Sequence, residues 1–256
     1  MMKSVRSIFN FLMAALLIVS PLALASQKTK VPEADVKVIF FDVNETLLDL
    51  HPLQKSVGDA LGGRPDLLSI WFSTMLHYSL VETSINQYHD FGKIGAAALI
   101  MVAQSNGLTI TQDQAKEALA PITKLPAHPD VREGLEALKS KGYKLVALTN
   151  SSRPAVEKQL KNAGLYDLFD EYLSGEAVHS YKPNLKVYNW AMQKIGVSSR
   201  ESLLVAAHGW DVAGAKQAGM NTAFVARAGQ AIYPLAKTPD YTVNDIIELS
   251  KILPAR

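Results

Sequence analysis

Two acidic residues and one lysine of this chain stand where they could support nucleophilic chemistry. Asp42 directly follows the apolar run 38–41, Lys182 lies in a polar stretch, and Asp211 follows the apolar run 203–207. An aspartate is ionised at neutral pH because its ordinary pKa is about 3.9. A nearby lysine would keep Asp42 anionic beside a second carboxylate and would orient it. A carboxylate held in this way can attack a substrate, form an ester and be released by hydrolysis.

Hydrogen-bond donors follow a third apolar run, residues 143–148. They are Thr149, Asn150 and Ser151. These residue types are also common in turns, so each polar cluster alone is a weak signal. In a parallel sheet the carboxyl ends of the strands meet at one edge, which is where ligands bind. The order and spacing of the clusters therefore predict one site that contains both carboxylates, the lysine and these donors.

Strand and helix patterns alternate on both sides of a long helical segment, which predicts an α/β fold with a doubly wound parallel sheet. Residues 36–51 and 126–256 are expected to form this core. No strand pattern interrupts residues 52–125, which we predict to be an all-helical cap inserted after the first strand. The expected strands are 38–41, 143–148, 171–173, 203–207 and 222–226, and the expected core helices are 129–141, 154–163, 185–195, 211–218 and 244–253.

The first 25 residues have the features of a secretory signal peptide. Lys3 and Arg6 precede an apolar run, residues 8–19, and the small-residue pattern 23–25 ends the segment. We predict cleavage after residue 25, a linker over residues 26–35, and a periplasmic or secreted protein without stable membrane association. The alternative is an uncleaved anchor, but the apolar run is shorter than the roughly 20 residues that a membrane span needs.

Composition excludes several kinds of chemistry and partner. The chain has 256 residues, of which 48% are hydrophobic, and this is enough to bury a full core. It has no cysteine, which excludes disulfides, thiolate nucleophiles and cysteine zinc sites. Removing residues 1–25 takes two of the 26 basic side chains and none of the 24 acidic ones, so the rest of the chain is formally neutral. No polybasic segment remains, and no nucleic-acid partner is expected.

Four motifs together resemble those of the haloacid dehalogenase superfamily, and most resemble its type II 2-haloacid dehalogenases. The motifs are FDVNETLLD at 41–49, LTNSS at 148–152, YKP at 181–183 followed by VY at 187–188, and WD at 210–211 followed by GA at 214–215. The resemblance runs from about residue 36 to residue 228. It implies a Rossmann-like core, a helical cap and a catalytic aspartate.

The resemblance also implies roles for single residues. Asp42 is the nucleophile, Thr46 is its hydrogen-bonding neighbour, and Lys182 and Asp211 complete the catalytic set. The candidate substrate-binding residues are Asn44, Phe72, Thr149, Asn150, Tyr188 and His208. The expected substrate is a small organic acid, and no metal or other cofactor is expected. Members of the family often form dimers, so the resemblance allows a homodimer.

Three positions depart from the family pattern. The first is Asn44. At this position phosphoryl-transferring relatives have an aspartate that transfers a proton, which an amide cannot do, and type II dehalogenases have an aromatic residue. The dehalogenases have an arginine in the cap where this chain has Phe72, which cannot replace a guanidinium as an anion ligand. They have serine and asparagine where this chain has Ala206 and His208. His208 could be a donor, a base for the hydrolytic water or a packed histidine.

Three functions stay open on the sequence alone. The leading one is a hydrolase that displaces halide from a small 2-halo carboxylic acid through an ester on Asp42. The second is a phosphatase with Mg²⁺ bound by Asp42, Asp211 and the main-chain carbonyl of Asn44, since oxygen ligands suit a hard cation. The third is a non-catalytic binder of small carboxylic acids, which the missing cap arginine suggests.

Overall fold

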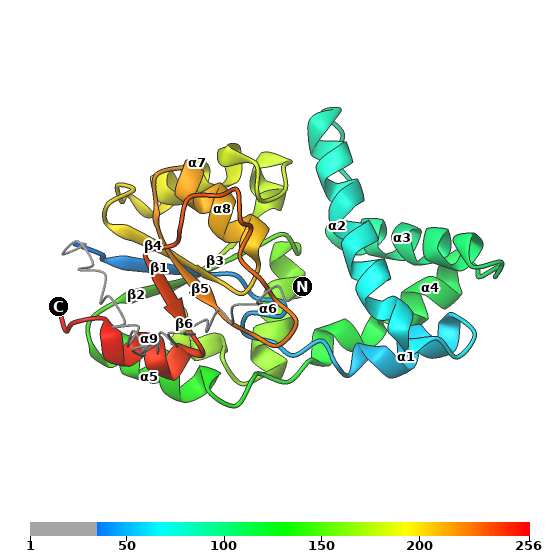
Figure 1. Cartoon of the computed structure of the whole chain (residues 1–256), viewed down its shortest axis with the longest axis horizontal. Helices are drawn as coiled ribbons and strands as arrows, with labels where there is room; N and C mark the ends of the chain where they lie inside the picture. Colours follow the sequence, from blue (N-terminus) through cyan, green and yellow to red (C-terminus); the bar gives the residue numbers. More distant parts are fainter. Residues whose placement is uncertain (1–34) are drawn as a thin grey trace, which may run out of the picture. The chain divides into compact units, whose positions relative to one another are not determined.

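A six-stranded parallel sheet forms the core of the protein (Figure 1). The computed structural model describes residues 35–256; the predicted signal peptide lies outside them, and so does the predicted linker apart from Asp35. The strand order is β3-β2-β1-β4-β5-β6. The strands are β1 Val38–Phe41, β2 Lys144–Thr149, β3 Glu171–Ser174, β4 Ser202–Ala206, β5 Asn221–Val225 and β6 Tyr241–Val243. The predicted α/β class with a parallel sheet is confirmed.

Strand β1 lies in the middle of the sheet because its side chains are apolar on both faces. All four of its residues are buried, and it pairs with β2 on one side and with β4 on the other. Continuous apolar runs of this kind are typical of parallel strands that helices cover on both faces. The chain therefore leaves the centre of the sheet at Asp42.

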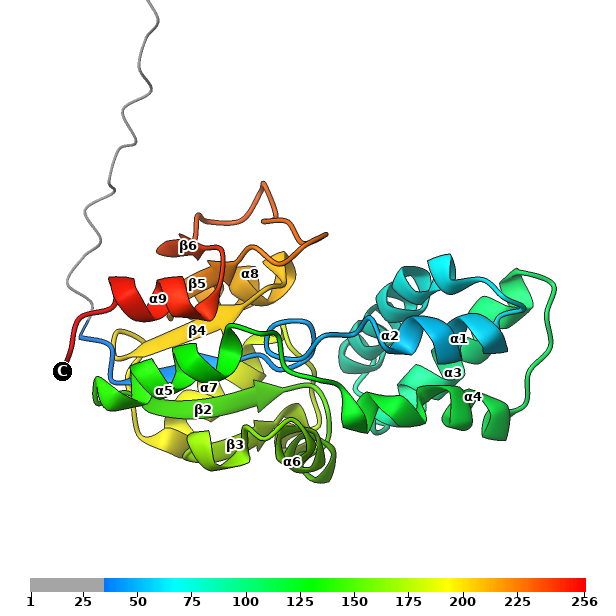
Figure 2. The same ribbon diagram turned by 90° about the horizontal axis from the view of Figure 1, so that it is seen from below.

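Helices cover both faces of the sheet (Figure 2). Apolar side chains of α5, α6 and α9 pack against the face that carries Ile39 and Phe41. Those of α7 and α8 pack against the face that carries Val38 and Phe40. The bounds of these helices are α5 Val131–Ser140, α6 Arg153–Asn162, α7 Leu185–Ile195, α8 Gly209–Gln217 and α9 Ile246–Ile252.

Four helices between the first two strands form the cap, and Figure 1 shows them grouped together. They are α1 Leu53–Ala60, α2 Leu68–Ser84, α3 Phe91–Ser105 and α4 Gln112–Leu119, with 3₁₀ turns at Pro65–Leu67 and Ala120–Lys124. Helix α4 begins with a capping box, in which Thr111 and Gln114 each bond the backbone N–H of the other. Within residues 35–256, no helix is long and apolar enough to cross a membrane.

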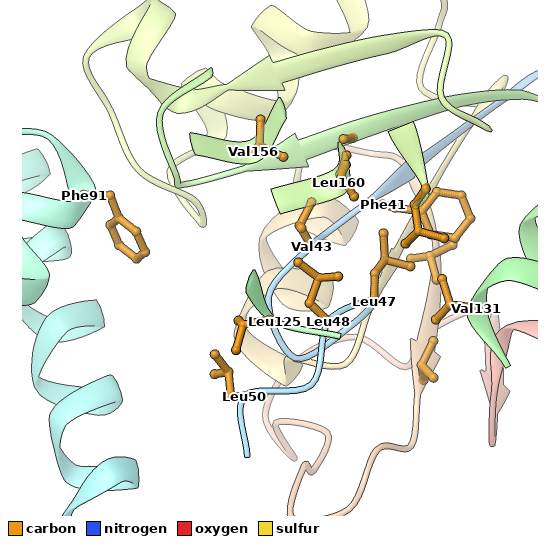
Figure 3. Close-up of a cluster of buried hydrophobic side chains, with 14 of the residues drawn as sticks. Phe41, Val43, Leu47, Leu48, Leu50, Phe91, Leu125, Val131, Val156 and Leu160 are labelled. Carbon is orange, nitrogen blue, oxygen red and sulfur yellow. The ribbon is translucent and has the colours of Figure 1, made fainter. Parts of the chain in front are cut away.

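The two segments that connect the cap to the sheet lie side by side. The backbone N–H of Asp49 donates to the carbonyl of Pro126 at 2.9 Å. Figure 3 shows Leu50 and Leu125 next to each other at this point, close to the apolar side chains of the loop after β1. This buried packing holds the loop that contains Thr46 in place.

The structure differs from the sequence prediction at one strand and at several element ends. Strand β6 was not predicted, because its three residues are too few to show an apolar pattern. Strand β4 ends one residue earlier than predicted, and the N–H of Ala207 donates to the Thr46 hydroxyl at 2.9 Å. Helix α9 begins at Ile246 rather than at residue 244, because the Asp245 side chain caps it.

Candidate active site

The carboxyl ends of the strands bring the three predicted charged residues together. Lys182 Nζ lies 2.9 Å from Asp42 Oδ1 and 2.5 Å from Asp211 Oδ2. All three side chains are buried. Charges out of contact with water are strongly unfavourable unless they are paired, and here the lysine pairs with both carboxylates. The contact that the strand ends predicted is therefore present.

Both oxygens of the Asp42 carboxylate have polar partners. Oδ1 accepts a hydrogen bond from Lys182. Oδ2 accepts one from the Thr46 hydroxyl at 2.7 Å and lies 3.1 Å from Nδ1 of His208. The Thr46 hydroxyl in turn accepts from the N–H of Ala207, so its own hydrogen points to Asp42. Asp42 is thereby held in one orientation.

The pairing also sets the relative acidity of the two carboxylates. Burial by itself would raise the pKa of Asp42, but Lys182, His208 and Thr46 hold that pKa well below its ordinary value. Burial raises the pKa of Asp211, because the attraction of Lys182 offsets it only in part. Asp42 is therefore the stronger acid of the two and stays anionic.

His208 connects Asp42 to Glu45, a residue that the sequence analysis missed. Nε2 of His208 lies 2.7 Å from Glu45 Oε2, and the rings of Phe72 and Trp210 stack on the imidazole with centroids 5.8 and 5.0 Å away. Burial would lower the pKa of His208, but its hydrogen bonds to Asp42 and Glu45 raise that pKa to about 9. The ring is therefore cationic at neutral pH. Glu45 lies in the same loop as Asp42, and this was the signal that could have identified it.

We expect the free energy of unfolding to fall above about pH 6.5 because of His208. The pKa of this residue is raised from 6.5 to about 9 in the folded protein, so its stabilisation is complete below 6.5 and is lost as the pH rises through 9. The loss is on the order of 3 kcal/mol. Urea unfolding of the wild type and of His208→Gln at about pH 6 and about pH 9.5 measures it. Equal losses in the two proteins would contradict the assignment.

Three of the predicted substrate-binding residues contact the catalytic loops instead of lining a cavity. Oδ1 of Asn150 accepts from the backbone N–H of Lys182 at 2.8 Å. The hydroxyl of Tyr188 donates to Asp211 Oδ1 at 2.6 Å. The hydroxyl of Thr149 accepts a backbone N–H two residues further along. All three side chains are buried, so the geometry gives them the task of positioning the charged groups.

Asn44 and Phe72, two of the positions that depart from the family pattern, have different surroundings. The Asn44 amide donates to the Ser151 hydroxyl at 3.3 Å and accepts from Gln159 Nε2 at 2.9 Å. It therefore links the loop after β1 to the loop after β2 and to α6. Phe72 comes from α2 of the cap and meets the core at His208.

A cavity of about 540 Å³ lies where helix α2 faces the catalytic loops. Its lining includes Phe72, Trp210, His208 and Glu45. Asp42 does not itself line this cavity, but His208 does, and its Nδ1 lies 3.1 Å from Asp42 Oδ2. The cavity is therefore linked to the carboxylate through His208. Phe72 and His208 are thus the predicted substrate-binding residues that face it.

Arg227, two residues after the end of β5, is a second residue that the sequence analysis missed. Its guanidinium donates to both carboxylate oxygens of Asp130, at 2.7 and 3.0 Å, and to the carbonyl of Thr46. Asp130 also accepts the N–H of Ile246 at the start of α9. Arg227 therefore ties the loop after β1 to the helices beneath it. Its place after a strand is the same signal that identified the other clusters.

We expect Arg227→Lys to destabilise the protein by about 2 kcal/mol, because a lysine cannot contact Asp130 and Thr46 in the same forked geometry. Urea unfolding measures the change. Arg64→Lys is the matched control, since Arg64 pairs with Asp66 on the exposed surface and its replacement should leave the unfolding midpoint unchanged. A loss for Arg227→Lys no larger than that of the control would refute the expectation.

The donor set around the two aspartates does not fit a divalent cation. Within residues 35–256, no group of three or more His, Cys, Asp or Glu side chains could hold a metal ion. Each oxygen of Asp42 and Asp211 already has a polar partner; these partners are Lys182, Thr46, His208 and Tyr188. A metal ion would have to displace the lysine ammonium from between the carboxylates.

A parallel sheet with a paired aspartate at the end of its central strand, and a helical cap inserted after that strand, defines a class of capped hydrolases. The chain belongs to the haloacid dehalogenase-like hydrolase family, which matches residues 36–219. This confirms the resemblance seen in the sequence motifs.

Several relatives are similar over most of their length. The (S)-2-haloacid dehalogenase of Pseudomonas sp. (strain YL) is 30% identical over 212 residues, which are 82% of this chain and 91% of that protein. Haloacetate dehalogenase H-2 of Moraxella sp. (strain B) is 29% identical over 209 residues, which are 81% of this chain and 93% of that protein. A similar solved structure is that of L-2-haloacid dehalogenase from Xanthobacter autotrophicus with chloropropionic acid covalently bound. It matches with a TM-score of 0.79 at 26% identity, over 85% of this chain and 98% of that chain.

Proposed function

We propose that this protein hydrolyses 2-halo carboxylic acids with Asp42 as the nucleophile. The observation that carries the proposal is a buried aspartate that Lys182 and Thr46 hold anionic and oriented, in contact with a histidine that lines a cavity. The names of the similar proteins support the same substrate class, since they include haloacid and haloacetate dehalogenases. A structure of one such relative has chloropropionic acid covalently bound, which agrees with an ester intermediate.

In the first step, a carboxylate oxygen of Asp42 attacks C2 of the acid. An oxygen–carbon bond forms, the carbon–halogen bond breaks, and the halide leaves with the bonding electrons. Lys182 keeps the attacking group ionised, and Thr46 limits its rotation. The product is an ester of Asp42, and attack opposite the halogen inverts C2.

His208 and Glu45 suit the second step, the hydrolysis of that ester. Esterified Asp42 carries no charge, so His208 loses one of the two carboxylates that raise its pKa. It can then release its Nδ1 proton to water while Glu45 still holds the Nε2–H. Neutral Nδ1 accepts a proton from the water that attacks the Asp42 carbonyl carbon, and returns it to the departing hydroxy acid. Asp42 is left in its acid form and gives the remaining proton to Nδ1, which restores the Asp42 carboxylate and the cationic His208.

Halide release from racemic 2-bromopropanoate by the purified protein tests the function. We expect one halide for each molecule of 2-hydroxypropanoate, no effect of a chelator, and no phosphate release from aryl phosphates with or without Mg²⁺. The chelator result is expected because the partners of Asp42 and Asp211 are a lysine, a threonine, a tyrosine and a histidine. Phosphate release that depends on Mg²⁺, with no release of halide, would favour the phosphatase instead.

A further inference from the structure

The cavity beside Asp42 is larger than a short 2-halo acid needs. Its volume is about 540 Å³, and cavities of about 300–1,000 Å³ usually enclose ligands of drug size. His208 and Glu45 line the cavity, and His208 contacts Asp42. A two- or three-carbon acid with its C2 at Asp42 would leave the rest of this space to water.

Helix α2 gives the cavity an apolar wall. Leu68, Phe72 and Leu76 line it at intervals of four residues, so they lie along one face of the helix, and all three are half-buried. Ser69 and Ser73, each one position further along, line the cavity too and are exposed. Because serine is small, it leaves free the space beside the apolar side chains that a larger residue would fill.

The opposite wall has a different character. It comes from the loops of the core and is mostly polar, with Asp49, His51, His128, Arg227 and Gln230 beside the apolar Leu50 and Trp210. A space with one apolar wall and one polar wall fits an amphipathic molecule that lies between them. The apolar wall is provided by Leu68, Phe72 and Leu76, which we call the α2 stripe. Its middle residue, Phe72, stacks on His208.

We propose that the preferred substrates are 2-halo acids with a longer alkyl or aromatic side chain, which lies along the α2 stripe while C2 is held at Asp42. This inference rests on the function proposed above and names its substrate class. Each methylene transferred from water to the stripe should improve binding by about threefold to fourfold. The specificity constant should therefore rise with chain length until the stripe is covered.

The test is the ratio of kcat/KM for halide release from 2-bromohexanoate to that from 2-bromopropanoate. We expect a ratio of about ten or more in the wild type. Ser69→Phe should remove most of this advantage, because the ring would fill the space beside the stripe. Ser140→Phe is the control, since Ser140 is an exposed helical serine on α5, and it should leave the ratio unchanged. A wild-type ratio of one or below overturns the proposal.

Binding without chemistry separates this inference from the proposed function. The variant Asp42→Asn lacks the nucleophile. Calorimetry of this variant with propanoate, hexanoate and octanoate measures how binding affinity depends on contact with the α2 stripe, without the chemical step. Affinity that rises with chain length supports the stripe even if no acid releases halide, an outcome that would overturn only the proposed reaction. If 2-bromopropanoate releases halide but affinity does not change with chain length, the proposed role of the α2 stripe is wrong and the proposed reaction is supported.

Discussion

Asp42→Asn should reduce halide release from 2-bromopropanoate at least about 10⁴-fold, because the amide has no anionic oxygen to attack C2. The residue is 5% exposed and bonds Lys182 and Thr46, so an amide of the same shape keeps most of the local packing. Steady-state halide release measures the effect. Asp59→Asn is the control, since Asp59 is an exposed carboxylate on α1, and it should change the rate less than about twofold.

Isotope labelling distinguishes a nucleophile from a base at Asp42. In a single turnover with excess wild-type enzyme in ¹⁸O water, the oxygen of the hydroxy acid should come from the Asp42 carboxylate and carry no label. The label should appear in the peptide that contains Asp42. If Asp42 only activated water, the first product would already be labelled and the protein would not. That result would exclude the ester mechanism even if Asp42→Asn were inactive.

The sequence predicted the meeting of Asp42, Lys182 and Asp211 because this contact follows from topology. Polar clusters that follow the strands of a parallel sheet gather at its carboxyl edge, and this includes Lys182 and Asp211, although they lie eight residues after β3 and five after β4. The same rule would have included Arg227, which follows β5 and reaches the carbonyl of Thr46. Apolar runs and helix caps likewise located most elements, and only the three-residue β6 was too short to detect.

The bond between His208 and Glu45 could not be predicted in this way, because it depends on the conformation of a loop. Glu45 has φ of 60°, in the left-handed region that residues other than glycine rarely adopt. In this conformation its carboxylate lies 2.7 Å from the imidazole. The stack of Phe72 on His208 is a second example, since it depends on where the cap helix meets the loop after β4.

Two departures from the family pattern turn out to be one local arrangement. Phe72 stands where the resemblance implies a cap arginine and His208 where it implies an asparagine, and the two rings are stacked at 5.8 Å with 21° between their planes. Because the pKa of His208 is raised to about 9, an arginine at position 72 would place a second cation against a charged ring. The apolar residue in the cap and the cationic residue in the core are therefore compatible with each other, and restoring the arginine alone would not restore the family arrangement.

His208→Gln should slow hydrolysis of the ester by about 10²- to 10³-fold and affect its formation much less, because only the second step needs a base. The variant should then release one halide per active site in a rapid burst and accumulate the ester. Stopped-flow halide detection measures the burst, and mass spectrometry of the intact protein measures the added propanoate. His77→Gln is the control, as His77 is an exposed histidine of α2 that does not line the cavity, and it should show no burst beyond that of the wild type.

Glu45→Gln should show the same burst with a smaller decrease in the hydrolysis rate, about 10-fold. An amide can still accept the Nε2–H of His208, but it has no charge to stabilise the imidazolium that forms when water is deprotonated. The pH dependence separates this role from a structural one. Losing the Glu45 carboxylate lowers the pKa of His208, so the pH at which hydrolysis reaches its plateau should shift downward. A decrease in the hydrolysis rate with an unshifted pH profile would instead indicate that Glu45 only supports the loop. An equal decrease in the rate of ester formation would contradict the roles of His208 and Glu45 in the second step.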